Sequence, residues 1–479
     1  MTRGVAAWGV YVPRRRIPRH AIADALAWRQ PPGTRKPAGE RSYAAWDEDA
    51  ITLAVEAARD ALGTDGRSRV GSLTLASTTL PFADRSNAGL VAAALNLGAR
   101  VSTEDTTGSQ RAATTALISA LERPGAGGHV VVASERRRTQ PGSSEELAYG
   151  DGAAAVLVAS EGVVAQYLGA CSEAVDFVDH YRESQADYDY SLEERWVRVE
   201  GMQKLVLPAV RGLLERLSLE GGDVSHLVTA LPAATSADLA RRLGCPPAVV
   251  REPLVSRLGH AGSAQILLEL AATLESAAEG ELIVVVGFGQ GVDVLALRAT
   301  GAIANRRPSS LAPVLASGLS DPSYTRFLAH GGELNLAAGM RAERDARTAH
   351  SVHYRKHATL NGLVGGRCTR CGTVQFPKAP ACVNPDCRAF GEQDDAPLAD
   401  EPAQVKTYTE DWLAYTPSPP LVYGNVASAS GANLFIEFTD VGPGELEVGM
   451  PLRFVFRVKD VDRVRGFHRY FWKATRVRS

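Results

Sequence analysis

Thr106-Thr107-Gly108-Ser109 and Leu258-Gly259-His260-Ala261-Gly262 are two small-residue turns, and an Ala- and Leu-rich helical pattern follows each of them. About twenty residues after the first turn comes an apolar run at 129–133, and a second run, at 282–287, follows the other turn at a similar distance. Short Val-rich runs between turn signals predict buried strands. The matched order of turn, helix and strand predicts that one structural unit occurs twice.

The segments that precede these turns repeat in the same way. Residues 49–62 have helical spacing and come before a predicted strand at 72–76, whereas residues 203–217 have helical spacing and come before one at 227–230. Buried strands that alternate with helices form sheets covered on both faces. We therefore predict an α/β region of two similar halves with central mixed sheets, at residues 1–160 and 161–300.

The composition is that of an ordinary globular protein with two or three domains. Of the 479 residues, 45% are hydrophobic and 22% charged, and the formal net charge is −2. A near-neutral chain gives no reason to expect nucleic acid or an acidic membrane surface as a partner. The arginine runs at 14–16 and 136–138 are interpreted as solvated faces. No apolar stretch reaches the ~20 residues that a membrane helix needs, so we expect no membrane partner.

Four of the six cysteines form the pattern C-x2-C-x10-C-x4-C, at Cys368, Cys371, Cys382 and Cys387. Two such knuckles present four thiolates in the tetrahedral arrangement that a structural zinc ion prefers, with no position left open for catalysis. A glycine directly after the second cysteine allows the tight turn that aims the sulfurs inward. The small number of cysteines, with no signal-peptide pattern, predicts a reducing, cytoplasmic location where disulfides are rare.

Beyond the cysteines the sequence changes to short β-type runs separated by Pro and Gly. Five such runs predict a small, partly open barrel: residues 405–409, 422–426, 433–438, 452–456 and 470–474. We interpret Tyr470, Phe471 and Trp472 as core or interface residues, because the chain lacks the basic character of a single-strand nucleic-acid binder. The remaining predicted domains are a connector with short helices at 301–361, a zinc ribbon at 362–400 and the barrel at 401–479.

Residues 3–300 resemble the thiolase superfamily, and within it the branch of hydroxymethylglutaryl-CoA synthases and ketoacyl synthase III. The resemblance rests on the order and spacing of Gly9–Pro13, Glu48–Ala58, Gly150–Ala155 and Phe288–Gly291. It implies a duplicated thiolase-like α/β fold.

The C-terminal part, residues 320–479, resembles a zinc-ribbon and OB-fold domain that accompanies thiolases and related acyltransferases. Gly449–Pro451 and Phe467–Lys473 carry this second resemblance. It implies a rubredoxin-like zinc ribbon followed by a small OB-type β-barrel, in an acyl-CoA context.

The chain departs from the thiolase resemblance at the active-site positions. Family enzymes place a nucleophilic cysteine at the turn before the first buried helix, whose N-terminus stabilises the thiolate. Here Gln110 occupies that position and Ser109 precedes it. The synthase glutamate and first histidine correspond to residues 76–79 and to Ala230, whereas His260 matches the last position. The usual condensation through an acyl-enzyme therefore cannot run in its ordinary form.

A first interpretation is an enzyme with altered chemistry that uses a thioester of coenzyme A or of an acyl carrier protein. The amide of Gln110 can donate a hydrogen bond to a thioester carbonyl or enolate. His260, if its pKa lies near neutrality, can act as acid or base. Direct acyl transfer, decarboxylation or the making or breaking of a C–C bond would fit, in specialised metabolism. In a variant of this interpretation, Ser109 is the nucleophile and His260 its base.

Two other interpretations stay open. In one, the region is a non-catalytic scaffold or acyl-binding partner beside a second, active thiolase-like subunit, and Ser109 and Gln110 cap a helix. In the other, the region only binds a small ligand or another protein. In each case the thiolase resemblance implies a homodimer that pairs through the edge of a sheet.

Overall fold

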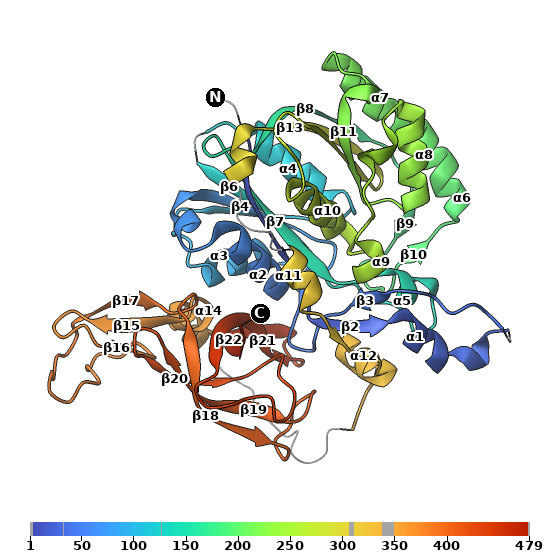
Figure 1. The fold of residues 1–479 in the computed structure, drawn as a ribbon. Helices are drawn as coiled ribbons and strands as arrows, with labels where there is room; N and C mark the ends of the chain where they lie inside the picture. The colour runs from blue at the N-terminus through green and yellow to red at the C-terminus, as the bar shows by residue number, and fades with distance from the viewer. Residues whose placement is uncertain (1–2, 32, 126, 306–310, 338–348, 478–479) are drawn as a thin grey trace.

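The computed structural model describes residues 3–31, 33–125, 127–305, 311–337 and 349–477. Figure 1 shows an α/β body, formed by residues up to about 300, above a smaller and mainly β region formed by the C-terminal residues. The fold-class prediction of a thiolase-like α/β region followed by a zinc ribbon and further β structure is confirmed.

One nine-stranded sheet forms the centre of the α/β body, in the order β11-β12-β13-β8-β1-β7-β6-β4-β5. The first half contributes β1 (Gly4–Tyr11), β4 (Val70–Ala76), β5 (Ser102–Thr106), β6 (Gly128–Glu135) and β7 (Gly152–Ala159). The second half contributes β8 (Ala165–Ala174), β11 (Val224–Thr229), β12 (Leu282–Phe288) and β13 (Gly291–Ala299).

The two halves of this sheet have the same pattern of strand directions. In the first half, β1 and β6 run antiparallel to β7, and β4 runs parallel to β6. In the second half, β8 and β12 run antiparallel to β13, and β11 runs parallel to β12. The halves join where the start of β8 pairs with the start of β1. This symmetry confirms the predicted internal repeat.

Helices cover both faces of the sheet. The equivalent helices α4 (Ala112–Glu122) and α10 (Gln265–Leu274) share one hydrophobic cluster with strands of both halves. Helix α2 (Ala50–Leu62) lies in a different cluster, and alternate residues of β6 face the two clusters, so α2 covers the opposite face. The two predicted turns precede α4 and α10, and the fold brings both turns to one region between the halves.

Shorter elements surround this body. The remaining helices of the body are α1 (Arg19–Ala25), α3 (Asn87–Ala94), α5 (Ser144–Ala148), α6 (Glu194–Trp196), α7 (Leu207–Arg216), α8 (Ala233–Leu243) and α9 (Val255–Leu258). Small strands are β2 (Arg15–Pro18), β3 (Glu40–Ser42), β9 (His180–Tyr181), β10 (Tyr190–Ser191) and β14 (Leu319–Ser320). The connector carries α11 (Leu311–Ala316), α12 (Tyr324–Gly331), α13 (His350–Arg355) and α14 (His357–Asn361). Parts of the predicted connector, 306–310 and 338–348, lie outside the described residues.

The C-terminal region contains two small sheets. The ribbon strands β15 (Val364–Cys368), β16 (Val374–Gln375) and β17 (Gln393–Pro397) have the order β16-β15-β17. The second sheet has the order β20-β19-β18-β21-β22, with β18 (Ala403–Asp411), β19 (Leu421–Ser428), β20 (Asn433–Glu437), β21 (Pro451–Asp462) and β22 (Phe467–Arg476). These strands contain the five predicted β runs, except that Phe438 lies just after the end of β20. A parallel bridge between Phe438 and Ala474 brings the two edge strands together. The assignment to the OB class stays a prediction.

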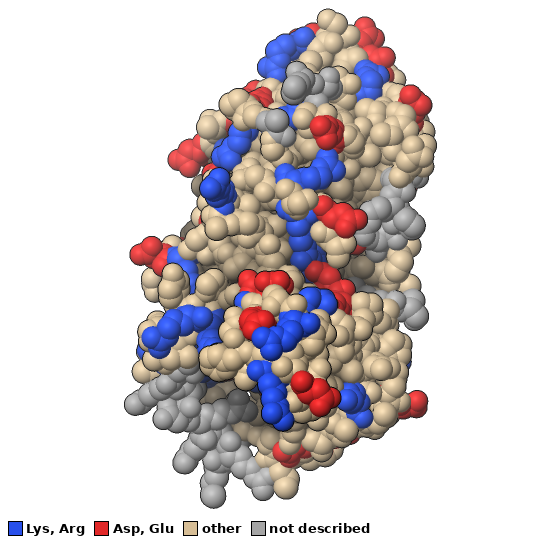
Figure 2. Space-filling view, turned by 90° about the vertical axis from the view of Figure 1, so that its left-hand side faces the viewer, with Lys and Arg blue, Asp and Glu red and all other residues tan. Residues whose placement is uncertain are grey.

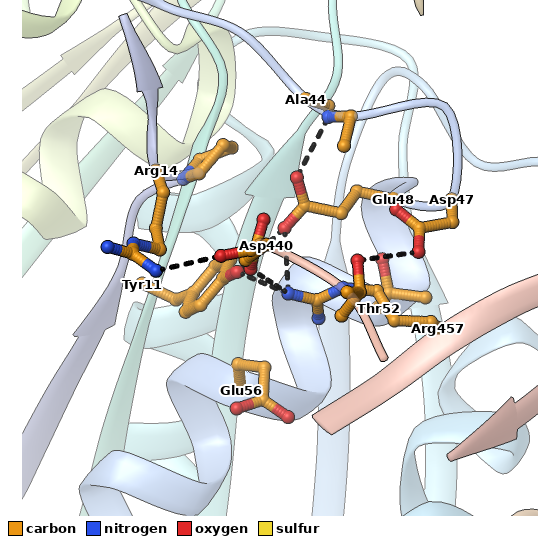
Figure 3. Close-up of polar contacts among 12 residues, drawn as sticks. Tyr11, Arg14, Ala44, Asp47, Glu48, Thr52, Glu56, Asp440 and Arg457 are labelled. Atoms are coloured by element: carbon orange, nitrogen blue, oxygen red, sulfur yellow. Dashed lines mark hydrogen bonds and ion pairs between the residues drawn. The ribbon is translucent and has the colours of Figure 1, made fainter. Parts of the chain in front are cut away.

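The C-terminal sheet packs on α2 through apolar contacts and buried charges. Trp472 is fully buried and its indole N–H donates to the carbonyl oxygen of Asn361 at 2.6 Å, so its interpretation as a core residue is confirmed. The Arg457 guanidinium is 1% exposed and lies 3.2 Å from both the Glu48 and the Asp440 carboxylates (Figure 3). Removing one member of a buried ion group leaves an uncompensated charge, so the Arg457–Glu48 pair helps to fix how the two regions meet.

The interpretation of the arginine runs as solvated faces is wrong. Arg16 and Arg137 are 1% and 5% exposed. The Arg137 guanidinium forms an ion pair with Asp189 and lies 3.5 Å from the centre of the Tyr149 ring. Arg137 is buried because a distant part of the fold supplies its acceptor, the Asp189 carboxylate, whereas Arg16 donates to the carbonyl of Pro13, three residues away.

Charged side chains of both signs occur on the face of the molecule that Figure 2 shows. On the face shown in Figure 2, basic and acidic side chains are interspersed. Among the residues described, no helix combines the length and the apolar character needed to cross a bilayer.

Candidate active site and zinc ribbon

The turn before α4 rests against a glycine turn of the second half. The Ser109 hydroxyl donates a hydrogen bond to the carbonyl oxygen of Gly289 at 2.6 Å, and the backbone N–H of Arg111 donates to the Ser109 hydroxyl at 3.2 Å. Gly289 has a φ of +155°, and a Cβ there would lie 3.1 Å from the Ser109 hydroxyl. The Ser109 side chain therefore helps to hold the two halves together at this point.

Gln110, the next residue, points its amide at a histidine that the sequence analysis did not single out. The Gln110 Nε2 atom lies 2.8 Å from Nε2 of His180, and Nδ1 of His180 lies 2.7 Å from Oδ2 of Asp179. All three side chains are partly buried. The structure thus places an Asp–His–Gln chain of hydrogen bonds where the family resemblance puts the nucleophile.

His260 is close by but makes its hydrogen bonds to the backbone. Its Nε2 donates to the carbonyl oxygen of Ala230 at 2.9 Å, and its Nδ1 accepts from the backbone N–H of Gly262 at 3.2 Å. Burial, reinforced by the Arg137 guanidinium, lowers the pKa of His260 from 6.5 to about 4. The expectation of a near-neutral pKa for His260 is therefore wrong, because burial favours its uncharged form.

Ala230, at the position of the first family histidine, lies beside His260 and accepts its hydrogen bond. At the glutamate position, the Thr78 backbone and the Thr78 and Thr79 hydroxyls donate to the carboxylate of Glu135, at 2.8 to 3.0 Å. The Ser263 hydroxyl adds a fourth hydrogen bond to this carboxylate at 2.7 Å. Glu135 is thus a buried carboxylate of the site that the sequence analysis missed. Its signal was an acidic residue at the end of a Val-rich buried strand.

A short hairpin, residues 179–191, covers this region and is held by ion pairs. Asp189 pairs with Arg137 and, at 3.2 Å, with Arg182. Burial alone would raise the pKa of Asp189, but the two guanidinium groups hold it below its ordinary value. Arg182 also donates to the backbone carbonyl of Thr78. These contacts fix His180 relative to the turn that carries Gln110.

The four cysteines of the ribbon converge as predicted. Their sulfur atoms all lie within 4.8 Å of one another, with 3.7 Å between Cys368 and Cys387 and 3.6 Å between Cys371 and Cys382. Four sulfurs about 2.3 Å from one tetrahedral centre are separated by roughly 3.8 Å. The set therefore fits a structural zinc ion, which would hold the two knuckles together. With four thiolate ligands, the ion has no position open for a substrate.

Comparison with known proteins identifies relatives of the α/β body. A hydroxymethylglutaryl-CoA synthase of Caldivirga maquilingensis is 30% identical over 303 residues, which cover 61% of this chain and 85% of the relative. The chain belongs to the hydroxymethylglutaryl-CoA synthase family. Another member, from Methanosarcina mazei, is 29% identical over 354 residues that cover 70% of this chain and the whole of the relative.

Solved structures of two synthases have the same fold as the α/β body of this hydroxymethylglutaryl-CoA synthase family member. A synthase crystallised with CoA superposes with a TM-score of 0.63 at 14% identity, covering 73% of this chain and 95% of that one. The 3-oxoacyl-(acyl carrier protein) synthase III of Pseudomonas aeruginosa superposes with a TM-score of 0.53 at 24% identity, covering 63% and 99%. Residues 355–392 match the family model of the ChsH2 rubredoxin-like zinc ribbon domain.

Among the described residues of this family member, the two cysteines outside the ribbon lie away from the turn. Cys171 is on β8, and Cys245 follows α8. Burial raises the pKa of both thiols, which disfavours the thiolate form that a nucleophile needs. Of the predicted site residues, the structure therefore brings Gln110 and Ser109 to the junction of the halves. His260 lies in the same region, because His180, the partner of Gln110, is close enough to influence its pKa.

Proposed function

We propose that the α/β body acts on acyl thioesters, as an acyltransferase or an enzyme that makes or breaks a C–C bond, without forming a covalent acyl-enzyme. The observation that carries the proposal is the Asp179–His180–Gln110 chain of hydrogen bonds at the junction of the halves. Membership of the hydroxymethylglutaryl-CoA synthase family and the CoA complex of a structural relative support a thioester substrate.

Gln110 supplies the electrophilic part of this chemistry. Its amide stands just before α4, where backbone N–H groups of the first turn favour negative charge. An amide N–H aimed at a thioester carbonyl stabilises the oxyanion or enolate that develops there. Because glutamine has no nucleophilic atom, the acyl group would pass directly from the thioester to its acceptor, or an enolate would form without an acyl-enzyme.

Coenzyme A and an acyl carrier protein are both proposed as carriers of the acyl group. Both present the same thioester to the site, so the chemistry at Gln110 is shared. A biosynthetic role in specialised metabolism and a cytoplasmic location belong to the same proposal. The location is supported by the two thiols outside the ribbon, Cys171 and Cys245, which form no disulfide.

A homodimer is proposed through β5. This strand ends the central sheet, and Ser102 and Glu104 on it are exposed. An exposed edge presents unpaired N–H and C=O groups that a second copy can pair with across a two-fold axis. Light scattering at micromolar concentration should give twice the chain mass, and a monomer would oppose the pairing.

The second candidate is a non-catalytic partner of an active thiolase-like subunit. The hydrogen bonds of His260 and Ser109 favour it, because both side chains are committed to holding the backbone. In this arrangement His260 can act on a substrate only after a backbone hydrogen bond breaks. The Ser109 nucleophile variant likewise requires the hydrogen bond to Gly289 to break.

Turnover by the isolated chain separates the candidates. Purified protein is mixed with a panel of acyl-CoA thioesters, with and without acceptors, and the release of free CoA is followed. The Gln110→Ala variant is the matched control, since it removes the amide and leaves the Ser109 hydrogen bonds in place. CoA release that depends on Gln110 supports the enzyme. No release from any thioester, alone or with a thiolase-like partner, leaves the scaffold candidate.

A further inference from the structure

Asp179 and His180 form a hydrogen-bonded pair that the family resemblance does not assign. Nδ1 of His180 lies 2.7 Å from the Asp179 carboxylate, at a separation typical of a charge-assisted hydrogen bond. An ionised carboxylate only accepts hydrogen bonds, so Nδ1 carries the proton. In the neutral imidazole, Nε2 is then left with a free lone pair.

That lone pair faces Gln110. A side-chain amide nitrogen only donates, so Gln110 Nε2 donates to His180 Nε2 across 2.8 Å. If the imidazole gains a proton, a half-turn of the amide presents its oxygen to the new N–H instead. Gln110 can therefore partner His180 in both charge states, which is what an acid–base group needs from its neighbour.

The second oxygen of Asp179 is also informative. Asp179 Oδ1 is buried and has no hydrogen-bond partner among the residues that the structure describes. A buried, unpaired carboxylate oxygen is costly, and a donor group on a bound substrate would remove that cost. The pair thus offers one basic nitrogen and one free acceptor oxygen.

Charged groups from several elements face this imidazole. Asp179 precedes it, Asp189 lies across the hairpin, and Arg182 and Arg137 pair with Asp189. His260 stands on the α10 side, neutral, with its pKa lowered to about 4 by burial first, then by Arg137. The charges of the two carboxylates and the two guanidinium groups cancel. The Asp179 carboxylate, which contacts Nδ1 directly, is therefore the group that stabilises an imidazolium.

We propose that Asp179 and His180 are the acid–base dyad of this site, with Nε2 of His180 acting on the group that occupies the place beside residue 110. The inference deepens the proposed function and rests on it for its substrate. In direct acyl transfer, Nε2 would take the proton of the acceptor as the new bond to the acyl carbon forms. As the C–S bond breaks, the same proton would pass to the sulfur of the departing CoA.

A thiol probe at position 110 tests the dyad without any thioester. In the Gln110→Cys variant, the new thiol replaces the side chain that faces Nε2 of His180, and an acid–base pair there should lower its pKa at least one unit below the ordinary ~8.5. The rate of iodoacetamide alkylation at residue 110 is measured against pH by peptide mass spectrometry. Adding His180→Asn should raise the thiol pKa toward its ordinary value, leaving only the lowering that the N-terminus of α4 supplies.

Ser109→Cys is the matched control. Its side chain points at the carbonyl of Gly289 rather than at His180, so His180→Asn should leave its alkylation profile unchanged. A thiol at position 110 whose alkylation profile is ordinary and indifferent to His180→Asn would overturn the dyad. A lowered thiol pKa without turnover of any thioester would instead uphold the dyad and reject the proposed function.

Should the cysteine variants fail to fold, the wild-type protein provides a second measurement. Nitrogen NMR of labelled histidines distinguishes the two neutral tautomers. The dyad requires the Nδ1–H form for His180, and Asp179→Asn should weaken that preference. An Nε2–H form for His180 in the wild type would overturn the proposal.

Discussion

His180 and His260 stand in the same junction between the halves, yet their imidazoles have opposite surroundings. Both ring nitrogens of His260 form hydrogen bonds with backbone groups, those of Ala230 and Gly262. The ring nitrogens of His180 form hydrogen bonds with two side chains, the Asp179 carboxylate and the Gln110 amide. Backbone partners cannot leave without disturbing the fold, whereas side chains can turn toward a substrate. Proximity to an active-site position therefore does not identify the acid–base group; the nature of its partners does.

The largest expected effect lies outside the junction of the two halves, in the zinc ribbon. Cys371→Ser should abolish binding of about one zinc per chain and unfold the ribbon, because structural zinc can supply on the order of 10 kcal/mol of folding free energy. Metal analysis and a thermal melt would measure this. Cys245→Ser, outside the ribbon, is the control and should keep the metal. A folded wild-type protein without bound metal would contradict the ribbon assignment.

The comparison itself is tested by equal substitutions at the two histidines. His180→Asn should lower turnover about 10²–10⁴-fold, as the loss of a general acid–base does. His260→Asn should lower it no more than about tenfold, because an asparagine amide can still donate to the Ala230 carbonyl. Single-turnover kinetics with one acyl-CoA would compare them. A larger loss at His260 would move the acid–base role to that residue.

The next largest effect on turnover is expected from loss of the Gln110 side-chain amide. Gln110→Ala should reduce kcat/KM by about 10²–10³, the usual result of losing one oxyanion donor. Ser109→Ala should have a smaller effect, since its hydroxyl contacts Gly289 and the backbone N–H of Arg111. The pair of variants is compared under the same thioester. Full activity in Gln110→Ala would place the chemistry elsewhere.

The smallest expected effect is on the pH dependence of stability. The folded pKa of His260 is about 4 and the ordinary value is 6.5, so the unfolded chain binds more protons between these values. The contribution of His260 to stability is thus complete above pH 6.5 and is lost as the pH falls toward 4. Its slope cannot exceed about 1.4 kcal/mol per pH unit.

His260→Asn should remove that part of the slope in denaturant unfolding. The difference from wild type is the informative quantity, because burial also lowers the pKa of His129 to about 4 and of His330 to about 3. Identical slopes in the two proteins would show that His260 titrates in the folded state much as it does in the unfolded chain.

The parts of the molecule that sequence predicted well depend on nearby residues. The zinc site comes from one stretch of twenty residues, 368–387, and the two halves from turns and strands in matched order. The parts that it missed depend on distant pairs. His180 is 70 residues from Gln110, and Arg137 is 52 residues from Asp189. Neither pairing leaves a periodic or spaced pattern, so the sequence favours a solvated arginine run at 136–138 and does not single out His180.

The family resemblance had a related limit at His260. It matched His260 to the last active-site position, and the structure places this residue beside Ala230. It gave no information on the backbone hydrogen bonds that occupy the imidazole or on the burial that lowers its pKa. These depend on how the chain closes around one side chain, which a matched position does not specify.

The most direct test of the account is the mass of the protein while it turns over. Wild-type protein is incubated with an acyl-CoA that it consumes, and intact mass and free CoA are recorded at the same time points. CoA should accumulate over many turnovers while no acyl group is added to Ser109 or to any cysteine. An acylated chain that forms and decays at the rate of turnover would contradict it.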